Sequence, residues 1–346
     1  MKNKVYMWIC LLCSTLSIYP AVVGGMPQLE KPGALYIDNQ KVFVVDQTSV
    51  HIYSLAGMRF IKTFGTKGEG PGEFKHQPLL TCYKDSILAN STGALTLFST
   101  TGELIWSRKI PFNYNYFALP VISLGKYFVG MMVKGRGSAV IVFDNAFNPK
   151  KEIYSGIVQL PPPPVGASGG NLKINVNAID DCFDYQIHDD KLFVGDTANG
   201  FFFTVFDRQG NHLYDIKKKD PKLEVNRKYR NAYMTNKQGS RIWRQEKNKY
   251  NYVFPKYFPA YFSFQIRDSK IYASTYKEKN GNYEIVVLDL KGNELKRAFA
   301  HPLQPFERMS EIGSYKNQYA IYDNKIYYIV DNEQTETWEL HCQTIK

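Results

Sequence analysis

Lys41-Val-Phe-Val-Val-Asp46 is the first of six copies of one short element, a polar residue followed by an apolar, β-branched or aromatic run. Such runs suit strands, because β-branched and aromatic side chains fit a pleated, half-buried surface. The copies begin at residues 41, 86, 126, 191, 270 and 325, with gaps of 45, 40, 65, 79 and 55 residues. The others are Ser86-Ile-Leu-Ala-Asn90, Lys126-Tyr-Phe-Val-Gly130, Lys191-Leu-Phe-Val-Gly-Asp196, Lys270-Ile-Tyr-Ala-Ser274 and Lys325-Ile-Tyr-Tyr-Ile-Val-Asp331.

Further strands flank each copy. In five of the six units an apolar strand, a turn and another strand follow, and in four of these a glycine supplies the positive φ angle of a tight hairpin turn. These stretches begin at Ile52, Leu97, Val142, Val205 and Val287. A strand also precedes each copy, at Ala34–Ile37, Leu79–Tyr83, Leu119–Leu124, Phe183–Ile187, Phe262–Ile266 and Gln318–Tyr322. Each unit therefore contains about four strands, the content of one propeller blade.

Six such units predict an all-β protein, a six-bladed β-propeller of about four strands per blade. The blades span about 33–74, 75–112, 117–156, 180–220, 258–300 and 312–346, with insertions at about 157–179 and 217–257. The sixth unit ends after Trp338–Ile345 without an outer strand. We predict that an N-terminal strand, around Met26–Leu29, closes the ring and covers the edge that would otherwise stay open.

The loop Phe64-Gly-Thr-Lys-Gly-Glu-Gly-Pro-Gly-Glu-Phe74 adds a family resemblance. It resembles the NHL-repeat signature, in which a Gly-Pro-Gly-x-Phe loop joins the outer strand of one blade to the next blade. Asp46, Asp196 and Asp331 lie where NHL repeats often carry an aspartate, and their recurrence indicates a structural task, such as an Asx-type turn. Over roughly residues 27–346 the chain resembles secreted bacterial six-bladed propellers of TolB-like architecture. A phosphate-binding loop is excluded, because the stretch lacks Gly-Lys-Ser/Thr and no helix follows.

The N-terminus has the pattern of an export signal. Two lysines precede a short apolar run, Val5–Leu16, and Pro20 is followed by small residues where cleavage could occur. We predict a signal peptide over residues 1–25 and a protein exported to the periplasm, the cell surface or the medium. An uncleaved anchor is the first alternative. Lipid attachment at Cys13 is the second, and it is disfavoured because Leu12 occupies a position where a small residue belongs.

No motif assembles a metal or catalytic site. The cysteines beyond the signal, Cys82, Cys182 and Cys342, have no zinc spacing, and no Gly-x-Ser-x-Gly elbow is present. Asp189-Asp190 is predicted to lie in a turn. For the cluster Asp180–Asp184 a solvated turn is favoured over a metal or acid–base role, since it lacks the spacing of a calcium loop.

The six histidines also lack metal-ligand spacing. We therefore predict no catalytic residues and no cofactor. A divalent metal in the central channel stays open, since propellers can bring ligands together from different blades; His51, His188 and His341 would be the candidates.

The positive charge is concentrated in one segment. Of a formal net charge of +11, the segment from Arg208 to Lys256 carries +10, from 14 basic and 4 acidic residues, and it is rich in tyrosine. A basic, aromatic insertion can bind anionic polymers, acidic saccharides or a membrane surface. The alternative is a solvated loop that packs its aromatic rings on the propeller wall. Helices are predicted over Lys222–Tyr233 and Ser240–Lys247, and the candidate binding residues are Arg227, Lys228, Arg230, Arg241, Trp243 and Arg244.

Two classes of function follow, beside a third possibility, a purely structural component of the cell envelope. The first is a monomeric, non-enzymatic binding propeller that recognises a glycan, a peptide or a partner protein through loops on one face. Peripheral contact with an anionic membrane is open, and nucleic acid is not expected as a partner of an exported protein. The second is a propeller enzyme of the lyase, lactonase or hydrolase type with its site in the central channel. The first is favoured, because a propeller fold licenses no activity by itself.

Overall fold

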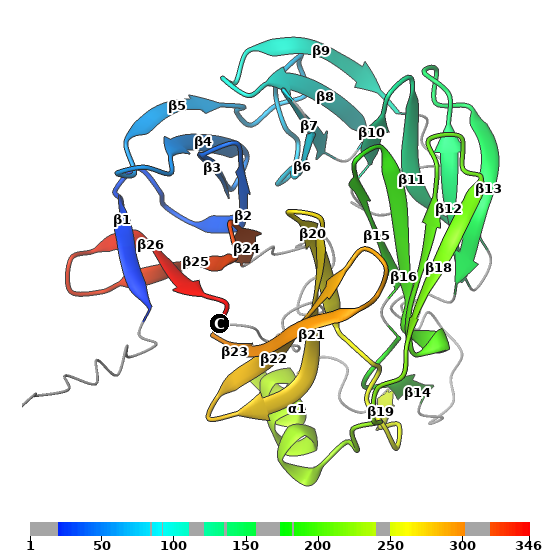
Figure 1. Ribbon diagram of the computed structural model, residues 1–346. Coiled ribbons are helices and arrows are strands. Elements are labelled where there is room, and N and C mark those ends of the chain that lie inside the picture. The colour runs from blue at the N-terminus through cyan, green and yellow to red at the C-terminus, as the bar shows by residue number, and fades with distance from the viewer. Residues whose placement is uncertain are drawn as a thin grey trace, which may run out of the picture.

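The computed structural model describes residues 20–346 apart from 84, 92, 111–120, 135–136, 157–173, 182, 240–249 and 302–318. Six antiparallel four-stranded sheets stand in a ring, so the protein is a six-bladed β-propeller, as predicted (Figure 1). The first strand of a blade is the innermost, because β2 contacts β6 and β24, and β15 contacts β10 and β20. All six inner strands lie within one or two residues of the stretches predicted for them, except that the third begins later, at Ile122.

The strands of each blade are named here from the centre outwards. Blade 1 contains β2 (Pro32–Asp38), β3 (Lys41–Asp46), β4 (Ser49–Ser54) and β5 (Phe60–Phe64), and blade 2 contains β6 (Leu79–Tyr83), β7 (Ser86–Ser91), β8 (Ala94–Ser99) and β9 (Leu104–Lys109). Blade 3 contains β10 (Ile122–Leu124), β11 (Tyr127–Lys134), β12 (Gly137–Phe143) and β13 (Pro149–Gly156), and blade 4 contains β15 (Phe183–His188), β16 (Lys191–Asp196), β17 (Phe201–Phe206) and β18 (His212–Lys218). Blade 5 contains β20 (Ser263–Arg267), β21 (Lys270–Lys279), β22 (Asn282–Asp289) and β23 (Glu294–Ala300).

Blade 6 is assembled from both ends of the chain. Its three inner strands are β24 (Tyr319–Tyr322), β25 (Lys325–Asn332) and β26 (Thr337–Thr344), and its outer strand is β1 (Ala21–Met26) (Figure 1). Strand β1 pairs antiparallel with β26, from Ala21 opposite Cys342 to Met26 opposite Trp338. The closing strand therefore begins earlier than the predicted segment around Met26–Leu29, and it lies almost wholly within the predicted leader.

The hairpin turns define two faces of the ring. The turn between the first and second strands has positive φ at both central residues in four blades, which is the type I′ geometry that matches strand twist. These pairs are Asn39-Gln40, Asp189-Asp190, Asp268-Ser269 and Asp323-Asn324. Since neighbouring strands run in opposite directions, these turns and those between third and fourth strands emerge together, on what we call the turn face. The connections between blades emerge on the opposite, connection face.

The loop from Phe64 to Phe74, which resembles the NHL signature and connects β5 with β6, is anchored by its terminal phenylalanine. Phe74 is buried, its amide donates to the Thr66 carbonyl (2.8 Å), and its ring lies 6.0 Å from that of Phe98 in the next blade. Gly65 has φ +77°, and a Cβ there would lie 2.3 Å from the Phe74 ring. The loop thus joins one blade to the next as expected, and Gly65 is needed both for its backbone angle and for its lack of a side chain.

We expect Gly65→Ala to lower the free energy of unfolding by about 1–3 kcal/mol for the left-handed backbone alone, and further because Phe74 must move. The matched control is Gly57→Ala, which has φ +72° but no atom within 4 Å of the added Cβ. Denaturant unfolding of both variants measures the difference. Equal losses in the two variants would show that the contact with Phe74 does not matter.

Two of the three recurring aspartates have a structural role, although not both in the predicted way. Asp196 caps the 3-10 helix η2 (Thr197–Asn199): its carboxylate accepts the Ala198 amide in an Asx-type turn. Buried Asp46 instead accepts the amides of Glu30 (2.6 Å) and Lys31 (2.9 Å), which fixes the chain leading into blade 1. Asp331 is exposed on β25. Only Asp196 makes the predicted turn, because the chain around each aspartate takes a different path.

Candidate functional site

The two long insertions meet on the connection face. Strand β14 (Ile174–Asn177), from the first insertion, pairs in parallel with β19 (Tyr250–Val253), from the second, with Ile174 opposite Tyr250 (Figure 1). The Ala178 amide that follows β14 also donates to the Val253 carbonyl. No pattern in the sequence predicts this pairing, because a four-residue parallel strand carries too little pattern to identify its partner. We call this pair together with helix α1 the insertion module.

Helix α1 (Arg227–Gly239) is the part of the module that packs on blade 5. The Asn226 side chain caps it by accepting the Tyr229 amide (2.8 Å), and the buried Tyr229 and Tyr233, one helical turn apart, join the core cluster that contains Phe258 and Tyr276. The helix begins five residues later than predicted, because the chain at Leu223–Val225 instead bonds to residues 256–258. The predicted helix at 240–247 lies outside the described residues.

The packing of α1 agrees with one of the two interpretations of this segment, since its tyrosines bury themselves against the propeller wall. Its polar face remains in water. No helix in the described part of the chain is both long enough and apolar enough to cross a membrane.

The candidate binding residues differ in whether their charge is paired with a carboxylate. Lys228 is engaged, because its ammonium group lies 2.6 and 2.8 Å from the two Glu278 carboxylate oxygens. The guanidinium of Arg230 lies over the Phe254 ring, 5.6 Å from its centre, and Arg227 is exposed. Arg241, Trp243 and Arg244 lie outside the described residues. The structure therefore places Arg227 and Arg230 together on the exposed side of α1.

Two further cations belong to this surface. Lys222 and Lys256 lie on the same ring, 5.6 and 5.1 Å from the centre of Tyr257. None of the four cations Lys222, Arg227, Arg230 and Lys256 forms an ion pair with a described residue, and all four are exposed. Three of these charges, those of Lys222, Arg230 and Lys256, are thus held against aromatic rings, and none of the four is neutralised by a described carboxylate. A count of charge along the sequence located the segment but could not show which cations were paired.

Asp180, the first residue of the aspartate cluster, lies close enough to α1 for its charge to act on the buried Tyr233. Burial, together with the neighbouring Asp181, raises the pKa of Asp180 to about 6. Its Oδ1 atom is buried and makes no hydrogen bond with a described residue, whereas Asp181 accepts one from the Thr197 hydroxyl (3.0 Å). Cys182 lies outside the described residues. Among those described, no group of three or more His, Cys, Asp and Glu side chains could hold a metal ion.

Asp38, Cys82 and Arg267, on the innermost strands around the central channel, interact electrostatically. Burial raises the pKa of Asp38 and also that of the Cys82 thiol, the latter to about 12, although the nearby Arg267 acts in the opposite direction on both. A thiol with this pKa stays protonated at neutral pH and is a poor nucleophile. Arg267 donates to the carbonyl of Ile266, while its Nε is buried and has no hydrogen-bond partner in the described part of the chain.

The three candidate histidines do not come together in the channel. His51 bonds to Thr63 (3.0 Å), His188 to Ser269 (3.3 Å) and His341 to Glu339 (2.9 Å). Only His188 lies on an innermost strand, since His51 and His341 belong to the third strands of their blades. The three histidines are therefore kept apart because the strands of His51 and His341 lie farther from the channel than that of His188, a difference that the sequence pattern did not reveal for single histidines.

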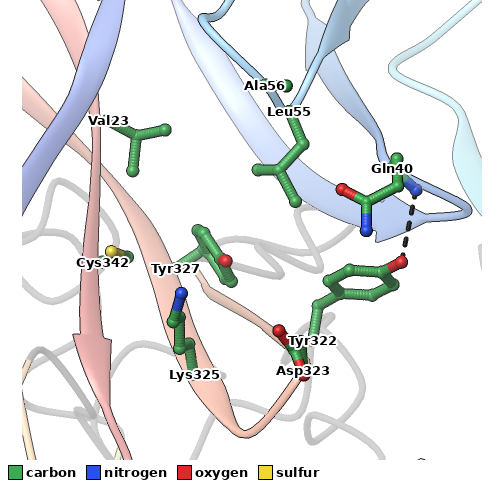
Figure 2. A pocket seen from close by; sticks show the side chains of 9 residues that line it. All are labelled: Val23, Gln40, Leu55, Ala56, Tyr322, Asp323, Lys325, Tyr327 and Cys342. Atoms are coloured by element: carbon green, nitrogen blue, oxygen red, sulfur yellow. Dashed lines mark hydrogen bonds between the residues drawn. The ribbon is translucent and has the colours of Figure 1, made fainter.

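A pocket of about 250 Å³ opens on the turn face between blade 1 and blade 6 (Figure 2). The main-chain amide of Gln40 in blade 1 donates to the Tyr322 hydroxyl of blade 6 (3.3 Å) and so bridges the two blades beside it. The polar residues that line the pocket are Gln40, Tyr322, Asp323, Lys325 and Tyr327, and the apolar ones are Val23, Leu55, Ala56 and Cys342. We call it the seam pocket, since Val23 comes from the strand that closes the ring. Sequence reasoning missed it because these residues come from five separate stretches.

The fold and its surfaces define the class of the molecule, a six-bladed β-propeller with an added insertion module. No family model matches the chain, and no curated protein matches it. Among solved structures it is similar to "KlHsv2 with loop 6CD replaced by a Gly-Ser linker", at 11% identity over 91% of this chain and 98% of the other, with a TM-score of 0.42. It is also similar to a chain of a nidogen/laminin complex, at 10% identity over 78% and 80%, with a TM-score of 0.40. These similarities concern the fold alone.

Proposed function

We propose that the protein is an exported, non-enzymatic binding propeller that recognises an acidic glycan through its insertion module. One observation carries the proposal: Lys222, Arg227, Arg230 and Lys256, on α1 or on the paired segments beside it, are exposed and form no ion pair with a described residue. Unneutralised cations held by a folded support lose less conformational entropy on binding than cations of a mobile loop. A linear polyanion can contact several of them at once.

Two finer expectations belong to the same proposal. The loop from Gly65 to Phe74 supports the assignment of the blades to NHL-type repeats, since Phe74 anchors it to the next blade. The N-terminal signal pattern supports export. Because strand β1 uses Ala21–Met26, a cleavage compatible with the closed ring falls before Ala21.

The test is binding of the protein to immobilised acidic polysaccharide over a range of salt concentrations. Replacement of Lys222, Arg227, Arg230 and Lys256 by glutamine is expected to weaken binding about tenfold or more, because each exposed ion pair contributes roughly 0.2–1 kcal/mol. Binding of the unmodified protein should weaken as salt rises, and the salt dependence should be smaller in the variant.

The matched control removes four charges elsewhere, by Lys31, Lys67, Lys109 and Lys291→Gln, all exposed on other parts of the ring. It should bind as the unmodified protein does, and so should Lys228→Gln, whose charge is already paired with Glu278. Equal weakening in both quadruple variants would leave only a net-charge effect and would refute the site. Binding to anionic vesicles but not to polysaccharide would replace the glycan by a membrane surface.

A further inference from the structure

We propose that the seam pocket binds a small organic carboxylate with an apolar body. This site lies on the turn face, opposite the insertion module, and does not depend on the proposed glycan binding. Its size sets the first limit: about 250 Å³ is below the roughly 300–1,000 Å³ of pockets for drug-sized ligands, so the occupant is small.

The cation of the pocket is Lys325, the first residue of β25. Its side chain is half-buried and lies against the pocket beside Tyr327 (Figure 2). It makes no hydrogen bond or ion pair with any described residue. This includes Asp323, whose exposed carboxylate lies at the rim of the pocket and does not pair with it. A partly desolvated ammonium group without a counter-charge favours an anionic ligand.

The neighbouring polar groups are suited to the same ligand. Burial raises the pKa of Tyr327 to about 12, so its hydroxyl keeps its proton at neutral pH and can donate to a carboxylate oxygen. The thiol of Cys342 also has a raised pKa through burial and brings no negative charge. The side-chain amide of Gln40 supplies a further donor on the blade 1 side.

The opposite side of the pocket is apolar and suits a hydrocarbon body. Val23 from the closing strand and Leu55 and Ala56 from the last turn of blade 1 form it (Figure 2). Transfer of a ligand methylene to such a surface is favourable, while the carboxylate remains at Lys325. An uncharged amide of the same shape would keep the apolar contact and lose the charge-assisted hydrogen bond.

The test is a ligand-observed NMR titration of the protein with butanoate, hexanoate and octanoate, each beside its primary amide. We expect saturable binding of at least one carboxylate, with its amide about tenfold weaker. Lys325→Gln should weaken carboxylate binding about tenfold. The control is Lys191→Gln, at the same position in blade 4, which should leave binding unchanged.

A second measurement follows alkylation of Cys342 by N-ethylmaleimide, read by mass spectrometry of its peptide. A saturating carboxylate should slow the reaction severalfold, and its amide at the same concentration should not. The proposal is overturned if carboxylate and amide bind alike, if Lys325→Gln and Lys191→Gln bind alike, or if the alkylation rate of Cys342 is unaffected.

Discussion

A chain that begins at Met26 is expected to fail to form a stable propeller. It lacks most of β1, and β26 then presents an open row of backbone donors and acceptors. The loss comprises several strand hydrogen bonds and the packing of Val23, together on the order of 5 kcal/mol, against a usual total of about 5–15 kcal/mol. Thermal unfolding followed by circular dichroism, with light scattering for aggregation, measures the outcome.

The matched control is a chain that begins at Pro20, which keeps the whole of β1. It should unfold cooperatively and remain monomeric. If the chain beginning at Met26 melted at the same temperature as this control, the ring would not depend on its N-terminal strand, and cleavage after Gly25 would be compatible with the fold.

The second large effect is expected at Arg297 on the outer strand of blade 5. Its guanidinium contacts Glu284 (3.2 Å), Asp220 (2.5 Å) and Glu294 (2.9 Å), and so joins blade 5 to the chain that leaves blade 4. The Glu284 side chain is only 2% exposed, and it also accepts from Thr275 (3.0 Å) and Lys277 (3.0 Å). A carboxylate so deeply buried is stable only while its partners remain.

Arg297→Met is therefore expected to lower the free energy of unfolding by about 3 kcal/mol, toward the lower end for a broken buried pair because Lys277 remains. Adding Glu284→Gln should restore part of the loss. Arg208→Met, which breaks the more exposed pair with Asp190, should cost less than about 1 kcal/mol. Denaturant unfolding at neutral pH measures all three, and equal losses for Arg297→Met and Arg208→Met would contradict the expectation.

The same cluster gives a dependence on pH. Hydrogen bonding from Arg297 lowers the pKa of Glu294 to about 2, from an ordinary value near 4.5. The pKa of Asp220 is also lowered, since its bonds to Arg297 and Lys218 outweigh the effect of burial. Carboxyl groups with lowered pKa values stabilise the fold above their ordinary pKa and lose that contribution as pH falls. The difference in stability between the protein and Arg297→Met should therefore shrink between about pH 4.5 and pH 2.

The repeat made most of the fold predictable. The runs that begin with a polar residue became the second strand of every blade, and the glycines at 57, 102, 210 and 292 all have positive φ, as the hairpin turns require. The closing strand was placed too late, because Ala21-Val-Val-Gly-Gly-Met26 combines strand-forming valines with small residues typical of a cleavage site. Local composition is compatible with either a strand or a cleavage site, and only the pairing with β26 identifies the segment as a strand.

The sites were less accessible from the sequence. Net charge identified the segment that carries α1, but it gave Lys228 the same weight as Arg227, although of the two only Lys228 has a carboxylate partner among the described residues. Lys222 and Lys256 are 34 residues apart and share the ring of Tyr257, a proximity that depends on the return of the chain beside itself. Surfaces built from distant stretches follow from tertiary packing, and a local pattern contains no information about them.

The junction of β1 with β26 also governs the order in which the chain is completed. At a synthesis rate of roughly 5–20 residues per second, about 20–60 s separate the emergence of the first strand from that of its partner. During that interval the earlier blades can form, but Val22 and Val23 lack their partner strand, and the pairing finally made spans over 310 residues of sequence, Met26 to Trp338. The first strand to be synthesised is thus the last to pair. If β1 pairs with β26 of its own chain the ring closes, whereas pairing with β26 of a second chain would give a domain-swapped dimer.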